Sequence, residues 1–269
     1  MLKNIISGLL AATMAIAGSA MAQSKQIKIG VIFDMSGALA AGGSNASYLG
    51  TKYAIDIINE RGGVEGYKIV PIYVDAQSKT EVAINETERL VNQEKVDVVM
   101  GVFSSAQCVP MAQRLDQAKK FMWANVCVSS AVFKDKNLKY IFRGQVHSDQ
   151  MGEASCKFLA ENSKSKFGKE IGDLKVAIIY EDGPYGAGVA MGNEVNCKQL
   201  GMQITLKEGY AATAPDLSAL VTKLRRARPD AILHTGYNPD ITLFLRQSKE
   251  QGLKWGALIG HGAGYGQFD

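Results

Sequence analysis

The sequence is poor in the residues and motifs that most enzymes use for metal binding and cofactor chemistry. Only three histidines occur in 269 residues, and none of the four cysteines belongs to a C-x-x-C pair, so a zinc site is not expected. No G-x-G-x-x-G follows a predicted strand, because GPYGAG at 183–188 has the wrong spacing, and neither a P-loop nor a G-x-S-x-G elbow is present. We therefore expect no cofactor and no metal.

Pairs of residues suited to acid–base or nucleophilic catalysis are also missing. Cys108 and Cys127 have no histidine near them in the sequence, and Glu181-Asp182 is interpreted as part of a solvated loop. We expect no catalytic residues, and an exported enzyme is the weakest of the alternatives. It stays open only because a site assembled by the fold is not visible in the sequence.

The charge balance excludes a strongly basic or acidic surface. Lys and Arg total 30 and Asp and Glu total 26, with both signs interspersed, for a net charge of +4. Basic clusters interleaved with aromatic residues are absent, so we expect no nucleic-acid partner.

Long apolar runs are absent after the N-terminus. Residues 1–22 carry Lys3, an apolar stretch from Ile5 to Ala17 that is too short to span a bilayer, and Ala20-Met21-Ala22 before Gln23. This pattern predicts a cleaved secretory signal peptide and an exported chain without stable membrane insertion. Disulfides are permitted in such a compartment. Three pairings are open, and the order along the chain favours Cys108–Cys127 and Cys156–Cys197.

The apolar pattern predicts an α/β protein made of two successive units with parallel sheets flanked by helices, residues 23–144 and 145–269. Trp123 and Trp255 fall in or beside expected strands, and we expect both in the core. The expected strands are 25–33, 66–74, 96–100, 120–128 and 140–143, then 174–180, 203–206, 230–233 and 255–259. The expected helices are 48–59, 80–92 and 110–119, then 149–162, 188–200, 216–227 and 241–251.

Small and polar residues follow the expected strands, at the edge where open α/β sheets bind ligands. The stretch 96–113 is the clearest case, because Ser104-Ser105-Ala106 stands between a buried strand and a helix. Two interpretations are open here. A serine caps the helix, or free backbone N–H groups beside the two hydroxyls form an anion site.

Several motifs together resemble the periplasmic substrate-binding proteins of branched-chain amino acid uptake, which serve ATP-driven (ABC) importers. They cover essentially all of the chain after the signal peptide. The resemblance implies a type I periplasmic binding protein fold, with two Rossmann-like lobes closing on a ligand, a membrane permease as partner, a periplasmic location and a monomer. The motifs are AIDIINERGGVEGYKI at 54–69, GVFSSAQCVP at 101–110, KVAIIYEDGPYGAG at 175–188, DLSALVTKLRRARPDAI at 216–232 and GYNPD at 236–240.

The resemblance also assigns candidate ligand-binding residues. Ser105 matches the serine that holds the ligand carboxylate, with Ser104 and Ala106 beside it. Cys127 matches a backbone contact and Ser129 a hydroxyl hydrogen bond. Two aromatic residues of the second lobe that close over the ligand match Tyr185 and Tyr237.

Three departures from the family pattern shape the expected function. Gly262 stands where amino-acid-binding members place an acidic residue against the ligand ammonium, and Gly42 stands where they place an aromatic wall. We therefore expect a small carboxylate that is bulky or aromatic and is not an α-amino acid, because a buried ammonium without a partner is costly. The third departure is length, since family members usually continue for roughly another hundred residues. We expect a fragment or, if the end is natural, an exposed sheet edge in the first lobe.

The open alternatives are branched-chain amino acid binding in the same kind of system and a ligand-sensing domain.

Overall fold

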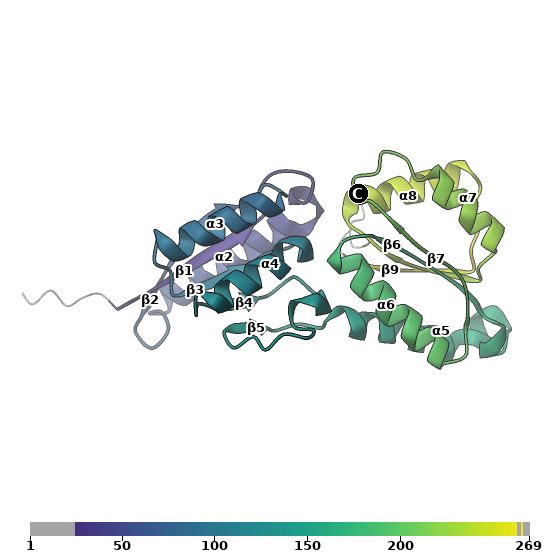
Figure 1. Cartoon of the computed structure of the whole chain (residues 1–269), viewed down its shortest axis with the longest axis horizontal. Helices are drawn as coiled ribbons and strands as arrows, with labels where there is room; N and C mark the ends of the chain where they lie inside the picture. Colours follow the sequence, from purple (N-terminus) through teal and green to yellow (C-terminus); the bar gives the residue numbers. More distant parts are fainter. Residues whose placement is uncertain (1–24, 263–264, 266–269) are drawn as a thin grey trace, which may run out of the picture.

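The computed structural model describes residues 25–262 and 265. The predicted signal peptide lies outside the described residues. In the described part of the chain, no helix is long and apolar enough to cross a membrane. Two parallel sheets with helices on both faces form two lobes arranged along the long axis of the molecule (Figure 1). The expected α/β architecture is confirmed, and the lobe boundary at residues 144/145 stays a prediction.

The first lobe is built on a five-stranded parallel sheet in the order β2-β1-β3-β4-β5. Pro71 lies in β2, an edge strand, where the missing N–H removes no bond needed in the sheet interior. Helix α2 packs on one face, and helices α3 and α4 bury most of the lobe's core against the other. The elements are β1 (Gln26–Phe33), η2 (Ala40–Ser44), α2 (Asn45–Glu60), β2 (Lys68–Asp75), α3 (Thr80–Asn92), β3 (Val98–Gly101), α4 (Ser105–Gln117), β4 (Phe121–Ala124), η3 (Ser130–Val132) and β5 (Ile141–Arg143).

The second lobe is built on a four-stranded parallel sheet in the order β7-β6-β8-β9. Helices α5 and α6 cover one face and α7 and α8 the other, each pair over its own apolar cluster (Figure 1). The elements are α5 (Ser148–Phe167), η4 (Ile171–Asp173), β6 (Lys175–Glu181), α6 (Pro184–Gln199), β7 (Gln203–Tyr210), α7 (Ser218–Ala227), β8 (Ala231–Thr235), α8 (Asn238–Glu250) and β9 (Ala257–His261).

Several helices begin earlier than the apolar pattern predicts, and three of them carry candidate site residues at their starts. Helix α4 begins at Ser105 instead of residue 110, α6 at Pro184 instead of 188, and α8 at Asn238 instead of 241. The first turns consist mostly of small or polar residues, so they carry no apolar repeat that marks them as helical. This shift places Ser105 and Tyr185 on first helical turns and Tyr237 at an N-cap, where backbone N–H groups are free.

The expectation of a buried Trp123 is wrong. Phe121, Trp123 and Phe142, on β4 and β5, are each nearly half exposed, because α2 packs beside β1 and β2 and no described helix covers this side of β4 and β5. The strand β4 alternates exposed and buried residues, as a sheet with one open face requires. Trp255 is partly buried and packs against the α7–α8 side of the second lobe.

Both favoured disulfide pairings are confirmed. Cys108–Cys127 joins α4 to the segment after β4, and Cys156–Cys197 joins α5 to α6. The first bond therefore ties together the two segments in which the sequence places the ligand clamp.

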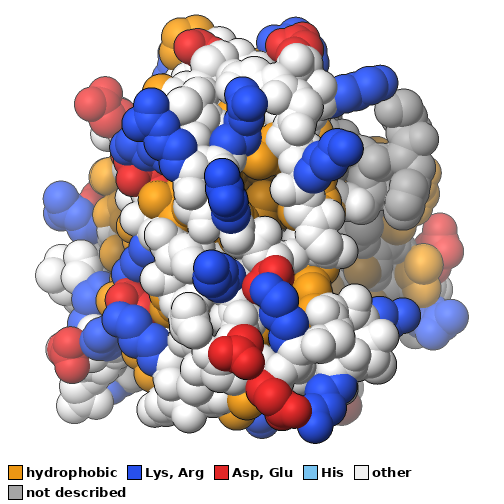
Figure 2. Space-filling model, turned by 90° about the vertical axis from the view of Figure 1, so that its right-hand side faces the viewer, with side chains coloured by type: hydrophobic (Ala, Val, Ile, Leu, Met, Phe, Trp, Pro, Cys, Tyr) orange, Lys and Arg blue, Asp and Glu red, His pale blue; other side chains and the backbone are white. Residues whose placement is uncertain are grey.

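The surface at the end of the second lobe carries many Lys and Arg side chains with acidic ones among them (Figure 2). Four basic residues border a shallow depression near the C-terminal end of α7, namely Lys175, Arg225, Arg226 and Arg228. This end faces away from the first lobe (Figure 1).

Candidate ligand-binding site

The turn between β3 and α4 is held in an unusual conformation. Val102, a β-branched residue, has a φ of 60°, a left-handed conformation that such residues adopt rarely and that concentrates at functional sites. Ser104 occupies the N-cap position of α4, but its hydroxyl makes no capping bond to the helix. Of the two interpretations of this turn, simple capping by Ser104 is therefore not what the structure shows.

A second segment lies against the start of α4. The Ser105 Oγ accepts a hydrogen bond from the Ser129 N–H at 3.3 Å, and the Cys108–Cys127 disulfide closes the same pair of segments. The Cys127 side chain is buried, and its sulfur is used in this bond. The Ser129 hydroxyl donates to the Pro184 carbonyl at 2.8 Å, so in this structure it joins the first lobe to the start of α6.

Two tyrosines approach this turn from the second lobe. The Tyr185 and Tyr237 ring centroids lie 5.4 Å apart, and Tyr237 also packs against Phe103 of the first lobe at 6.1 Å. The phenolic oxygen of Tyr237 lies against the Ser104 hydroxyl and the Ser105 N–H, whose hydrogen bonding opposes the effect of burial on its pKa. Burial raises the pKa of both tyrosines well above the usual value, so both hydroxyls are neutral at pH 7.

These residues line an inner cavity of about 140 Å³ between the lobes. None of the described residues that line it carries a charge. Ser105, Tyr185 and Tyr237 provide the side-chain hydrogen-bonding groups, and the rest of the wall is apolar side chain or glycine. The lining residues are Phe103, Ser105, Val126, Val128, Met151, Tyr185, Gly236, Tyr237 and Gly262.

Gly262 lies in the wall of this cavity. Its φ is 113°, and a Cβ added there would meet both the Tyr185 hydroxyl and the Gly236 carbonyl at 2.6 Å. Only glycine fits this backbone and this space. An acidic side chain at this position is therefore incompatible with the observed packing.

Gly42 lies elsewhere. It is buried in η2, and a Cβ added there would lie 3.2 Å from the Asn238 Cβ of the second lobe. It lines neither the inner cavity nor the larger outer cavity described next. The structure therefore places Gly42 at a contact between the lobes, where the missing side chain allows close approach.

A larger outer cavity of about 370 Å³ lies on the other side of Tyr237. Ser104 and Ala106 line it from the first lobe. Two residues with buried carboxyls, Glu181 and Asp240, line it from the second lobe. Its other lining residues are Ala38, Leu39, Ser78, Thr80, Gln107, Pro184, Ala212, Thr213, Ala214, Tyr237 and Pro239.

The interpretation of Glu181 as a residue of a solvated loop is wrong. Its side chain is buried at the end of β6, and its carboxyl accepts the Gly183 and Gly186 N–H groups at 2.7 and 2.5 Å. It therefore shapes the turn that starts α6 and positions Tyr185. The sequence did carry a signal for this role, because Glu181 stands two and five residues before Gly183 and Gly186, whose N–H groups are free at the start of a helix.

A buried polar network in the second lobe holds the backbone of Tyr237. The Tyr237 N–H donates to Asp240 Oδ1 at 2.9 Å, and Tyr210 donates to Asp240 Oδ2 at 2.6 Å. The oxygen of Tyr210 then accepts from His234 Nε2, 2.6 Å away. Burial lowers the pKa of His234 to about 3, so the ring is neutral and fits this arrangement. The sequence did not identify Tyr210, His234 or Asp240.

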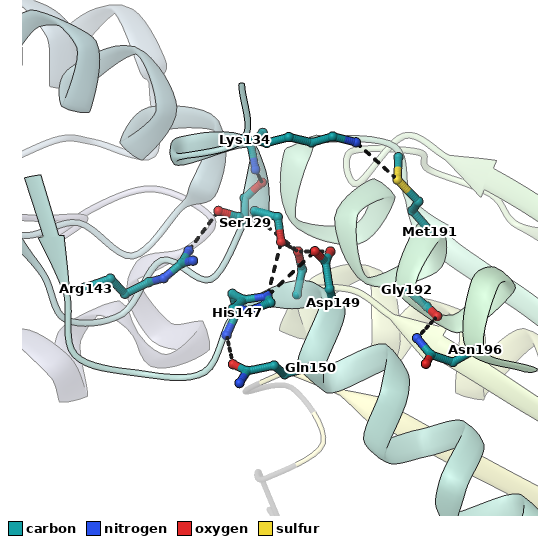
Figure 3. A network of polar contacts seen from close by, with 12 residues as sticks. Ser129, Lys134, Arg143, His147, Asp149, Gln150, Met191, Gly192 and Asn196 are labelled. Carbon is teal, nitrogen blue, oxygen red and sulfur yellow. Dashed lines mark hydrogen bonds and ion pairs between the residues drawn. The ribbon is translucent and has the colours of Figure 1, made fainter. Parts of the chain in front are cut away.

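Another polar network lies at the junction of the lobes (Figure 3). Arg143 donates to the Ser129 carbonyl at 2.8 Å, and the Ser130 hydroxyl lies 2.8 Å from the Ser148 hydroxyl and 3.4 Å from His147 Nδ1. None of these residues lines the inner cavity. They fix the segment that carries Ser129 and the start of α5.

Comparison with known proteins gives consistent relatives. A family model described as periplasmic binding protein matches residues 26–267. The Leu/Ile/Val-binding protein homolog 7 of Brucella suis is 35% identical over 263 residues, which are 98% of this chain and 64% of that protein. Homolog 8 of Brucella abortus is 34% identical over 239 residues, or 89% of this chain and 59% of that protein. The chain thus spans less than two thirds of the length of these relatives.

Solved structures share the fold. The branched-chain amino acid substrate-binding protein LivJ of Streptococcus pneumoniae, in complex with isoleucine, has a TM-score of 0.75 at 26% identity and covers 88% of this chain and 64% of its own. A solute-binding protein of Rhodopseudomonas palustris in complex with 3,4-dihydroxybenzoic acid has a TM-score of 0.74 at 22% identity, with 90% and 63% covered. At that identity the second likeness shows the fold alone.

Proteins of this family bind substrates for transporters and are not enzymes, which confirms the expectation of a non-catalytic fold. The family also implies the periplasm as the location. On the family model, the relatives and the two-lobed fold together, the chain belongs to the periplasmic binding protein family.

Proposed function

We propose that this chain binds a small aromatic carboxylate in the cleft between its lobes, as the monomeric solute-binding component of an ABC importer, and delivers it to a membrane permease. The division into lobes 23–144 and 145–269 belongs to this proposal. The family match, the two-lobed fold and the residues gathered from both lobes at the inner cavity support it.

The start of α4 supplies the site for the carboxylate. The Ser105 N–H and the Ser104 hydroxyl both lie against the Tyr237 oxygen, which supports an acceptor site at the start of α4. The N-terminal end of a helix favours negative charge. In this proposal the hydroxyl of Ser105, which lines the inner cavity, donates to the ligand carboxylate, and Ser129 adds a contact when the cleft rearranges around the ligand.

The size and lining of the inner cavity carry the proposal for an aromatic body. Its volume is about 140 Å³, and its walls are formed mainly by Phe103, Val126, Val128, Met151 and the two tyrosine rings. An apolar cavity of roughly 150 Å³ is large enough to hold benzene. A benzoate-like acid places its ring among these side chains and its carboxylate toward Ser105.

The lining of the cavity disfavours an α-amino acid. A buried ammonium group needs an anionic or strong hydrogen-bonding partner. Gly262 has no side chain to offer, and the space beside it is filled by the Tyr185 hydroxyl. The nearest buried carboxyls, Glu181 and Asp240, line the outer cavity instead.

Branched-chain amino acid binding is the second candidate. Two observations favour it: the names of the Brucella relatives and the isoleucine bound to LivJ. The two candidate functions differ in one requirement: an amino acid needs a partner for its ammonium group in the site, and an aromatic carboxylate does not.

A thermal-shift screen with leucine, valine, benzoate and 4-coumarate tests the proposal. We expect benzoate to raise the melting temperature and the two amino acids to leave it unchanged. Ser105→Ala should weaken benzoate binding about tenfold, since hydrogen bonds to charged groups contribute roughly 1.5–3 kcal/mol. Ser165→Ala, on the outer part of α5, is the matched control and should bind like the parent. Stabilisation by leucine with no response to either aromatic acid would overturn the proposal.

A further inference from the structure

Tyr237 lies between two of the cavities that both lobes line. The inner cavity of about 140 Å³ and the outer cavity of about 370 Å³ share one lining residue, Tyr237. Its ring lies between Phe103 of the first lobe and Tyr185 of the second. Its hydroxyl lies against Ser104, which lines the outer cavity, and Ser105, which lines the inner one. Tyr237 thus forms a partition across the cleft.

The backbone that carries this partition is fixed. The Tyr237 N–H donates to Asp240, which in turn accepts from Tyr210 in the buried network. Gly236, just before it, has no room for a side chain, because a Cβ would lie 2.3 Å from Asp240 Oδ2 and 2.7 Å from the Tyr210 hydroxyl. The backbone therefore cannot shift easily, and the two cavities join only if the Tyr237 side chain rotates or is removed.

We propose that Tyr237 is the residue that limits ligand length, so that the parent chain accepts single-ring acids of benzoate size and rejects acids with a longer chain between ring and carboxylate. This inference rests on the proposed function, because it assigns the carboxylate to the start of α4. The inner cavity has about the volume that holds one benzene ring, and Ser105 lies in its wall. A longer acid bound at Ser105 needs more space than this, and the Tyr237 ring lies between it and the larger outer cavity.

Calorimetric titration of benzoate and cinnamate tests the partition. For the parent chain we expect benzoate to bind at least about tenfold more tightly than cinnamate, which is the range that misfit of one or two methylene-sized groups produces. This measurement needs no variant. Equal affinity of the parent for the two acids would overturn the inference.

Two substitutions sharpen the test. Tyr237→Ala removes the ring and joins the cavities, so the preference for benzoate over cinnamate should fall at least about tenfold. Tyr237→Phe keeps the ring and removes only the hydroxyl, so it should keep the preference of the parent chain. Melting temperatures of both variants confirm that they are folded.

The outcomes separate the two proposals. If benzoate binds but Tyr237→Ala keeps the parent's preference, the partition is wrong and the proposed function stands. If leucine binds and neither aromatic acid binds to any of the three proteins, the proposed function itself is wrong.

Discussion

Two aspartates at the ends of neighbouring strands show how local contacts shift the pKa of a carboxyl in opposite directions. Asp34 is fully buried after β1, and its Oδ1 accepts from the Ser78 N–H and from Gln107 at 2.8 and 2.7 Å. Its Oδ2 and the Gln107 Oε1 are buried with no partner among the described residues. Burial raises the pKa of Asp34. At Asp75 burial acts in the same direction, but hydrogen bonds from Ser36 and from backbone N–H groups outweigh it, and the pKa is lowered.

The two aspartates should respond to amidation in opposite ways. The stability that protonated Asp34 provides is present below its unfolded pKa and lost as pH rises through its raised folded pKa. Asp34→Asn should therefore stabilise the protein at pH 7 by on the order of 1 kcal/mol. The asparagine buries no charge, and its amide donates to the otherwise unpaired Gln107 Oε1. The gain should disappear near pH 4.

Asp75→Asn is the matched control with the opposite sign. The stability from ionised Asp75 is present above its unfolded pKa and lost as pH falls, so this variant should be less stable at pH 7. Urea unfolding at both pH values measures the two effects. A destabilised Asp34→Asn at pH 7 would contradict the assignment of Asp34 as a buried group that favours its neutral form.

At this scale the sequence predicted which residue types gather at the cleft but not their partners. Ser104, Ser105, Tyr185 and Tyr237 come together as the family resemblance implied. The contact of Ser129 with the second lobe was not predictable, because it depends on how closely the lobes approach. The burial of Glu181 was missed for a similar reason, since only the folded turn brings two N–H groups to its carboxyl.

At the level of helices and strands, the candidate site residues Ser105, Tyr185 and Tyr237 lie at the starts of helices. The succession of strands and helices along the chain follows from apolar periodicity, but the first turns of α4, α6 and α8 do not, because their small and polar residues have no apolar repeat. The Cys108–Cys127 disulfide holds the first of these helix starts against the segment of Ser129. The Cys156–Cys197 disulfide joins α5 to α6, and neither cysteine lines the inner cavity.

Removing the two disulfides separately should separate stability from binding. Each Cys-to-Ala pair should lower the free energy of unfolding by about 3–4 kcal/mol, as expected for loops of roughly 20 to 40 residues. The Cys108/Cys127 pair should also weaken benzoate binding, because the clamp segments are no longer tied. The Cys156/Cys197 pair is the control and should leave affinity unchanged. Equal loss of affinity in both variants would show that the first disulfide has no specific role at the site.

At the scale of the whole molecule, non-covalent contacts join the lobes near the cleft in the described part of the chain. They include the Ser129–Pro184 hydrogen bond, the Phe103–Tyr237 ring contact and the close approach of Gly42 to Asn238. Contacts of this kind suit a protein that must open to admit a ligand. The apolar pattern predicted two lobes, whereas the exposed aromatic face on β4 and β5 was not predicted, because alternation in a strand does not reveal which face a helix covers.

We propose that the cleft selects an aromatic carboxylate over an α-amino acid. Isothermal titration of one protein sample with benzoate and with leucine, at the same pH and ionic strength, tests this selectivity. We expect saturable binding of benzoate at a single site and no measurable heat of binding with leucine. Tight leucine binding together with no binding of benzoate would contradict it.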